Sequence, residues 1–235
     1  MTALASLRVG GVVPFSAVDW PGKLAAVVFL QGCPWRCGYC HNPHLQRGDA
    51  PDATPGVALD DFLDERTGLL DAVVFSGGEP TAQAALPDAL REIDARGFAA
   101  GLHTAGAYPR RLEASLGWTS WVGFDVKAPV RRYAAVTRVP GSAAVAHASL
   151  RLVVASGVDY EVRTTVHPAL LDDGALLRLG DELASLGVRR WVIQPFRAQG
   201  CADAALVAQA HEGARLDASL VARLAERVPA VEVRG

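Results

Sequence analysis

Two adjoining segments decide the fold of this chain: the apolar run Leu24-Ala25-Ala26-Val27-Val28-Phe29-Leu30 and the segment Cys33-Pro34-Trp35-Arg36-Cys37-Gly38-Tyr39-Cys40-His41-Asn42-Pro43. The apolar run is short, continuous and rich in β-branched residues, which is typical of a buried strand. The three cysteines follow it on a loop. Their spacing allows three thiolates to converge on one object, as soft sulfur ligands do for zinc or for an iron–sulfur cluster.

Three other uses of these cysteines stay open on spacing alone. A structural zinc site of Cys33, Cys37, Cys40 and His41 would be unusual, because zinc ligands commonly come in pairs from two hairpin-like segments. The stretch from Cys37 to His41 also matches the attachment pattern of c-type haem. A thioredoxin-like redox pair would leave Cys33 unused. A cluster held by three cysteines would keep one iron free for a substrate or cofactor.

The composition around this loop is that of one globular domain. The chain has 235 residues, of which 50% are apolar and 20% charged, and this is enough for a substantial core. The formal charge of −2 gives no basic stripe and argues against a nucleic-acid partner. Four cysteines, three of them clustered, indicate a reducing compartment. With no export signal and no apolar run of transmembrane length, we expect a cytoplasmic protein without a membrane partner.

Strand-like and helix-like segments alternate along the chain. The predicted strands are 24–30, 71–75, 98–103, 121–126, 160–166, 188–194 and a last one at 231–233. The predicted helices are 58–67, 82–96, 109–116, one within 143–156, 175–186 and 216–227, and 48–56 is a connecting loop. This alternation implies right-handed crossovers and a mainly parallel sheet. Its six strand–helix units fall short of a closed eight-unit barrel.

The spacing Cys33-x-x-x-Cys37-x-Tyr39-Cys40 resembles the cluster-binding signature of the radical S-adenosylmethionine (SAM) enzymes. The flanking residues are Ser16-Ala17-Val18-Asp19-Trp20-Pro21-Gly22-Lys23, Gln31-Gly32 and His41-Asn42-Pro43. With them, the chain is similar to the activating proteins of the anaerobic, glycyl-radical ribonucleoside-triphosphate reductases from about Leu7 to about Gln199. The resemblance implies an open, partial (β/α)6 barrel in a single domain over 1–235, with a cluster loop at 31–43 and a C-terminal helix and strand within 216–234.

The same resemblance implies a cofactor set and a reaction. Cys33, Cys37 and Cys40 would hold a [4Fe–4S] cluster, and SAM would bind its open iron. Reductive cleavage of SAM to a 5′-deoxyadenosyl radical would then generate a glycyl radical on the reductase, with a flavodoxin- or ferredoxin-type electron donor. The rivals are an activase for another glycyl-radical enzyme, a small-molecule enzyme such as a carboxydeazaguanine synthase, and a zinc-binding module without catalysis.

The predicted strands deliver polar residues to their C-terminal ends, where parallel barrels gather their chemistry. Ser76-Gly77-Gly78-Glu79-Pro80 follows the second strand; its glycines allow close approach to a ligand, and it resembles the family's Gly-Gly-Glu motif, which receives the methionyl amino group of SAM. Asp125 and Lys127 share one face of the fourth strand and resemble the family's Asp-x-Lys motif in the cofactor pocket. Arg163 suits a carboxylate partner, and the family places an arginine near the carboxylate of the cofactor.

The remaining candidates lie on the third strand and on the cysteine loop. In related formate-lyase activases the turn matching His103-Thr104-Ala105-Gly106 begins with an aspartate that helps to hold a monovalent cation, a charge that His103 cannot supply. Thr104 is expected either to contact the cofactor or to be an ordinary turn residue. Tyr39 would pack against adenine or shield the cluster from water. The family places Asn42 by the cofactor, and Cys201 is expected to be an unliganded thiol.

Overall fold

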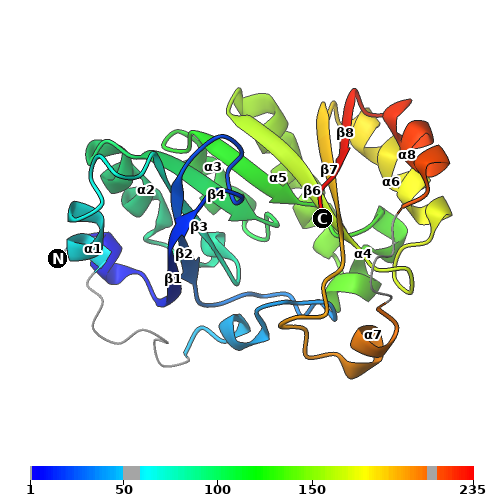
Figure 1. Ribbon diagram of the computed structural model, residues 1–235, viewed down its shortest axis with the longest axis horizontal. Coiled ribbons are helices and arrows are strands. Elements are labelled where there is room, and N and C mark those ends of the chain that lie inside the picture. Colours follow the sequence, from blue (N-terminus) through cyan, green and yellow to red (C-terminus); the bar gives the residue numbers. More distant parts are fainter. Residues whose placement is uncertain (1, 50–58, 211–215) are drawn as a thin grey trace.

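The computed structural model describes residues 2–49, 59–210 and 216–235 (Figure 1). Within these ranges one sheet contains eight strands in the order β1 to β8. Their bounds are β1 Val9–Ser16, β2 Ala25–Leu30, β3 Ala72–Gly77, β4 Ala99–Thr104, β5 Trp121–Asp125, β6 Asp159–Val166, β7 Arg190–Pro195 and β8 Ala230–Val233. β1 pairs with β2 antiparallel, and every other neighbouring pair is parallel. The predicted mainly parallel sheet is confirmed.

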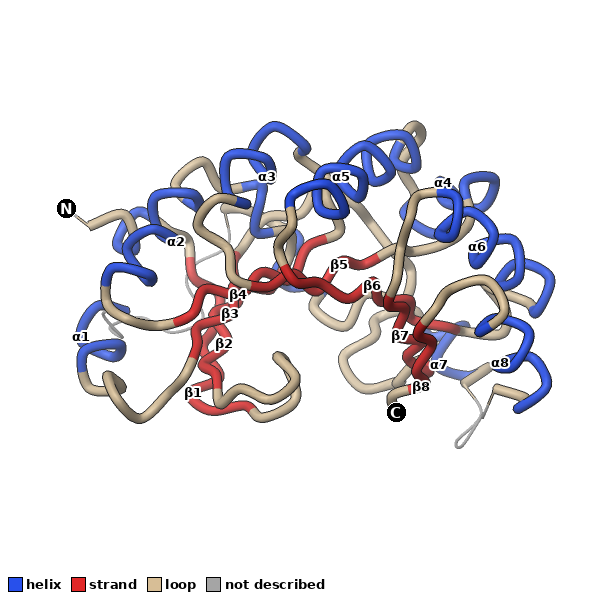
Figure 2. Tube along the Cα trace, turned by 90° about the horizontal axis from the view of Figure 1, so that it is seen from above, coloured by secondary structure: helices blue, strands red, loops and turns tan. Residues whose placement is uncertain are grey.

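Helices cover one face of this sheet. They are α1 Leu59–Asp64, α2 Leu86–Ala95, α3 Pro109–Leu116, α4 Val130–Thr137, α5 Ser142–Ser156, α6 Asp173–Ser185, α7 Ala204–Ala208 and α8 Ala218–Ala225, with 3₁₀ turns η1 Leu4–Ser6, η2 Pro43–Gln46 and η3 Pro80–Ala82. Figure 2 shows the sheet bent into an arc with helices along its convex side and with β1 and β8 at its two unjoined ends. The open, partial barrel is confirmed. None of the helices in the described ranges combines the length and apolar character that a membrane crossing requires.

Side chains alternate between the two faces of each strand. On the convex face, Phe75, Leu102 and Phe124 belong to the main core beneath the helices. A smaller apolar cluster lines the concave face, where Trp20 stacks on Trp121 with ring centroids 5.4 Å apart. Trp20 belongs to the β1–β2 connection. The tip of that hairpin therefore folds into the barrel and fills part of its interior.

Several predicted boundaries differ from the structure. β1 was not predicted, because Gly10, Gly11 and Pro14 disfavour a strand; an edge strand with shifted register accommodates them. α4 was also not predicted, and it precedes the helix expected within 143–156. Helix α2 begins at Leu86 because η3 forms first after Pro80. The predicted loop at 48–56 and the start of the helix at 58–67 lie largely outside the described residues.

Candidate active site

A cavity of about 180 Å³ opens where the parallel strands end. Segments that follow β2, β3, β4 and β5, together with the end of β6, contribute its wall, as expected for the C-terminal edge of such a sheet. The predicted site residues that line it are Cys33, Cys37, Cys40, Tyr39, Asn42, Gly77, Gly78, Thr104, Asp125 and Lys127. Glu79 and Arg163 are not among the lining residues.

The cysteine loop is fastened to two neighbouring elements. The backbone N–H of Cys33 donates to the carbonyl of Gln46 in η2 over 3.1 Å. Trp35 is buried and packs edge-on against Tyr133 of α4, with ring centroids 5.8 Å apart. The buried indole anchors the middle of the loop, so the cysteines are held in place by ordinary packing.

The buried thiols of Cys33 and Cys37 point to a cationic ligand. Burial raises the pKa of Cys33 to about 12, and the nearby Glu79 carboxylate adds to the effect. Burial also raises the pKa of Cys37. Thiolates at these positions therefore need positive charge beside them. Three cysteines that line one cavity are a donor set that fits a sulfur-bound iron cluster, because thiolates are the ligands of such clusters.

The Gly77-Gly78 turn lies directly against the start of the cysteine loop. Gly77 has φ +116°, and a Cβ there would lie 2.3 Å from the backbone N of Leu30. A Cβ on Gly78 would lie 2.6 Å from the carbonyl O of Gly32. Both glycines line the cavity, but the close approach that requires them is to protein backbone. The prediction of a tight turn is correct, and the reason for it is packing of β3 against β2.

Glu79 lies behind the cavity wall and joins two turns. Its buried carboxylate accepts hydrogen bonds from the backbone N–H and hydroxyl of Thr81 at 3.1 and 2.6 Å, from the Thr104 hydroxyl at 2.5 Å, and from the backbone N–H of Ala105 at 2.9 Å. Four donors satisfy the carboxylate. Glu79 therefore positions the β4 turn, while Thr104 itself faces the cavity.

Asp125 and Lys127 place an ion pair in the cavity wall, with Lys127 Nζ 2.7 Å from Asp125 Oδ2. Burial alone would raise the pKa of Asp125, but the charge and hydrogen bond of Lys127 outweigh it, and the pKa lies below its usual value. Burial likewise opposes the charge of Lys127, yet Asp125 holds the pKa of the amine well above its usual value. Both groups are charged at neutral pH. They can meet a zwitterionic ligand with both signs of charge.

Tyr39 and Asn42 flank the third cysteine. The Lys127 ammonium lies 5.7 Å from the centre of the Tyr39 ring. The buried Tyr39 hydroxyl has no hydrogen-bond partner among the described residues, which marks a polar atom available to a ligand. Asn42 is half-buried just before η2 and lines the same cavity. The structure brings both predicted residues to the site.

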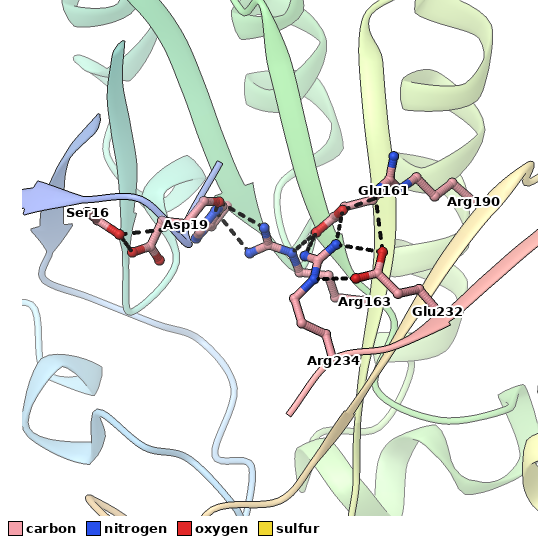
Figure 3. A network of polar contacts seen from close by, with 8 residues as sticks. Ser16, Asp19, Glu161, Arg163, Arg190, Glu232 and Arg234 are labelled. Atoms are coloured by element: carbon pink, nitrogen blue, oxygen red, sulfur yellow. Dashed lines mark hydrogen bonds and ion pairs between the residues drawn. The ribbon is translucent and has the colours of Figure 1, made fainter. Parts of the chain in front are cut away.

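Arg163 lies on the concave face outside the cavity lining and belongs to a network of polar contacts (Figure 3). Its guanidinium donates to Glu161 at 2.7 Å and to the carbonyl of Asp19 at 2.9 Å. It also lies 2.9 Å from His103 Nε2 and over the Trp121 ring. Burial and the Arg163 charge lower the pKa of His103 to about 4, so this imidazole is neutral at pH 7. Arg163 fixes the hairpin tip beneath the site and holds His103, which itself lines the cavity.

Glu161 is the centre of this network. Its buried carboxylate accepts from Arg163 and also from Arg234, at 2.8 Å. Burial alone would raise its pKa, but hydrogen bonds and charge from Arg234 and Arg163 hold it below the usual value. Its stabilising effect is therefore present above the pKa of an unfolded glutamate and is lost as pH falls through the folded pKa.

We expect Glu161→Gln to lower the free energy of unfolding at pH 7 by about 3 kcal/mol, because it leaves buried arginine charge uncompensated. The variant should also lose less stability than the wild type between pH 7 and about pH 4. Urea unfolding at both pH values measures the two effects. Glu113→Gln, at an exposed position of α3, is the control and should change stability by less than about 0.5 kcal/mol. Equal effects of the two substitutions would contradict the assigned role of Glu161.

Some lining residues were not among the predicted site residues. They are Trp35, Gln46, Ser76, Ala105 and Thr165. Ser76 and Thr165 each lie on the concave face near the end of a predicted strand, so strand alternation could have indicated them. Gln46 carries no such signal, because its place depends on how η2 folds back onto the cysteine loop.

Comparison with known proteins gives a match to a family model. The model of the radical SAM superfamily matches residues 27–178. A protein of Methanocaldococcus jannaschii named as a glycyl-radical enzyme activating enzyme is 30% identical over 173 residues, which cover 70% of each chain. The pyruvate formate-lyase-activating enzyme of Streptococcus mutans is 29% identical over 205 residues, covering 79% of this chain and 76% of that protein.

Solved structures share the fold at low sequence identity. A domain of the pyruvate-formate lyase-activating enzyme from Bacteroides vulgatus aligns with a TM-score of 0.54 at 16% identity, covering 70% of this chain and 99% of the domain. SuiB of Streptococcus suis, bound to its precursor peptide SuiA, aligns with a TM-score of 0.64 at 13% identity and covers 89% of this chain. The chain spans 48% of the length of SuiB. These likenesses concern the fold.

Proposed function

The chain belongs to the radical SAM superfamily, and on this premise we propose that it activates a glycyl-radical enzyme and that its target is an anaerobic ribonucleoside-triphosphate reductase. It is a radical SAM enzyme with glycyl-radical enzyme activating enzymes among its relatives. The observation that carries the proposal is the cavity in which three cysteines of one loop meet the turns after β3, β4 and β5.

The residues present fit a cluster and SAM side by side. Cys33, Cys37 and Cys40 would hold three corners of a [4Fe–4S] cluster, and no further lining side chain is a cysteine. When bound, the pair supplies one-electron cleavage of SAM and a radical that removes a hydrogen atom from glycine. The protein binds and orients the cofactor and excludes water from it.

The other lining residues would bind SAM. Asp125 and Lys127 offer both signs of charge to its amino acid part, and Gly77 and Gly78 bring backbone close to it. The unpartnered Tyr39 hydroxyl and Asn42 supply neutral polar groups, and Thr104, whose hydroxyl is bonded to Glu79, would contact SAM by packing against it. Glu79 and Arg163, which do not line the cavity, would position the groups that do.

The choice of the reductase as target is supported by the sequence before β2. The segment that resembles the reductase activases is Ser16-Ala17-Val18-Asp19-Trp20-Pro21-Gly22-Lys23. In the structure it packs inside the barrel, where Trp20 stacks on Trp121 and the Asp19 carbonyl accepts a hydrogen bond from Arg163. A flavodoxin- or ferredoxin-type protein would supply the electron.

The test uses oxygen-free protein with reconstituted iron and sulfide, SAM and dithionite. In one arm it is mixed with an anaerobic ribonucleotide reductase, and in the other with pyruvate formate-lyase. We expect a glycyl doublet in the electron paramagnetic resonance (EPR) spectrum of the reductase, with 5′-deoxyadenosine formed in step. A doublet on the lyase alone would assign the chain to another glycyl-radical enzyme. Cleavage of SAM without a doublet in either arm would favour a small-molecule substrate.

A further inference from the structure

Arg36 carries an exposed positive charge on the cysteine loop itself. Its Nη1 donates to the carbonyls of Cys33 and Trp35, at 2.6 and 2.9 Å. Among residues 2–49, 59–210 and 216–235, no carboxylate forms an ion pair with Arg36, unlike Arg47 and Arg138, which pair with Asp49 and Asp203. The Nε–Nη2 edge of the guanidinium is thus available for a carboxylate of another molecule.

Arg138 lies beside the same loop, next to Thr137, whose carbonyl accepts a hydrogen bond from the backbone N–H of Arg36 at 2.9 Å. Within the described ranges it is the one non-glycine residue with positive φ, at 58°, a conformation that costs an ordinary residue about 1–3 kcal/mol. Its exposed guanidinium bonds to Asp203 at 2.9 Å and lies 3.0 Å from the position of a Cβ on Gly38. This backbone conformation places the guanidinium beside Gly38, the residue that follows Cys37.

Arg197 flanks the far end of the loop. Its carbonyl lies 2.8 Å from His41 Nε2 and can accept a hydrogen bond from it. Gly200, with φ +82°, approaches so closely that a Cβ would lie 2.4 Å from the carbonyl O of His41. The Arg197 side chain is exposed and has no ion-pair partner among the described residues. The segment after β7 therefore brings a third arginine to the cysteine loop.

These three residues, Arg36, Arg138 and Arg197, form a positively charged rim around the loop that carries Cys33, Cys37 and Cys40. Asp203 is the one carboxylate paired with the rim in the described part of the chain. The whole chain carries a formal charge of −2, so the positive charge is local. A local field of one sign steers partners of the opposite sign.

We propose that the arginine rim is the docking surface for a small acidic protein that carries one electron. The inference rests on the proposed function, which requires an external electron. In this step the reduced carrier is oxidised by one electron and the cluster is reduced by one electron, with no atom transferred. Because Arg36 is bonded to the Cys33 carbonyl, a carboxylate on Arg36 brings the surface of the carrier against the cluster loop.

The test measures how fast a reduced carrier bleaches the cluster absorbance at several ionic strengths. A flavodoxin and a [2Fe–2S] ferredoxin are used in separate arms, which distinguishes flavin-type from iron–sulfur-type carriers. We expect Arg197→Glu and Arg36→Gln together to lower the second-order rate about tenfold or more at low salt and to flatten its salt dependence. Arg189→Glu, at the opposite end of β7, should leave the rate unchanged.

Dithionite separates this inference from the proposed function. Arg197→Glu should be reduced by dithionite at the wild-type rate and should form as much 5′-deoxyadenosine; a failure of wild-type SAM cleavage with dithionite would overturn the proposed function instead. The reduction rate and the 5′-deoxyadenosine yield of each variant are expressed per cluster, from its iron content. An unchanged rate with both carriers would overturn the docking surface. So would a variant that is reduced normally but no longer activates the reductase, since the rim would then serve the target enzyme.

Discussion

Replacing Cys37 by alanine is expected to abolish cluster binding, so that iron after anaerobic reconstitution falls from about four atoms per chain to near zero. Cys37 is the middle cysteine of the loop and lines the cavity together with Cys33 and Cys40. Two remaining thiols cannot hold three corners of a cluster. Iron and sulfide analysis, together with the visible absorbance of the cluster, measures the loss.

The matched control is Cys201→Ala. The Cys201 thiol lies against the carbonyl of Gly38 at 3.5 Å and does not line the cavity. Its removal should leave the iron content unchanged. Loss of iron in Cys201→Ala equal to that in Cys37→Ala would show that the fourth cysteine is a ligand, and the open coordination site would then be excluded.

Gly77→Ala is expected to have the largest effect on stability, with a loss of about 3 kcal/mol or more in the free energy of unfolding. At φ +116° any side chain is strained, and the new Cβ would lie 2.3 and 2.4 Å from the backbone N and O of Leu30. Backbone atoms of a central strand cannot move aside as a flexible side chain can. The β3 turn would have to leave the cysteine loop, and SAM binding should weaken with it.

Gly68→Ala separates strain from collision. Gly68 has φ +77°, and no heavy atom lies within 4 Å of a Cβ placed there. It should therefore lose only about 1 kcal/mol, the cost of the backbone conformation. Urea unfolding gives both values, and SAM titration of the reconstituted protein gives the affinity. Similar stability losses in the two variants would contradict the packing role of Gly77.

Strand periodicity predicted most of the sheet because buried parallel strands are continuous apolar runs. The ends of β4, β6 and β7 fall within two residues of the prediction. Edge strand β1 was not predicted, because its glycines and Pro14 are tolerated only in a strand that pairs along one side. Helix α4 was not predicted either, because Val130, Val136 and Thr137 are β-branched residues that disfavour a helix intrinsically. Burial of Tyr133 and Val136 in the main core stabilises the helix instead.

The candidate site likewise contains residues whose positions the sequence predicted and residues whose contacts it did not indicate. Alternation along β5 was sufficient to place Asp125 and Lys127 on one face, and the loop spacing was sufficient to gather the cysteines. Glu79 was expected to meet the cofactor, but Thr81, Thr104 and Ala105 donate to its carboxylate behind the wall. Arg163 was expected at the cofactor carboxylate, but Glu161 and the Asp19 carbonyl take its donors. Both outcomes depend on partners far away in the sequence, which periodicity does not indicate.

The central claim is that three cysteines leave one iron of a cluster free for SAM. The most direct test is the low-temperature EPR spectrum of the dithionite-reduced, reconstituted protein, recorded without and with SAM. We expect a reduced-cluster signal whose g values shift when SAM is added and stay unchanged when adenosine, which lacks the methionine part, is added instead. Stoichiometric zinc without an iron signal, or a cluster signal that SAM does not alter, would contradict it.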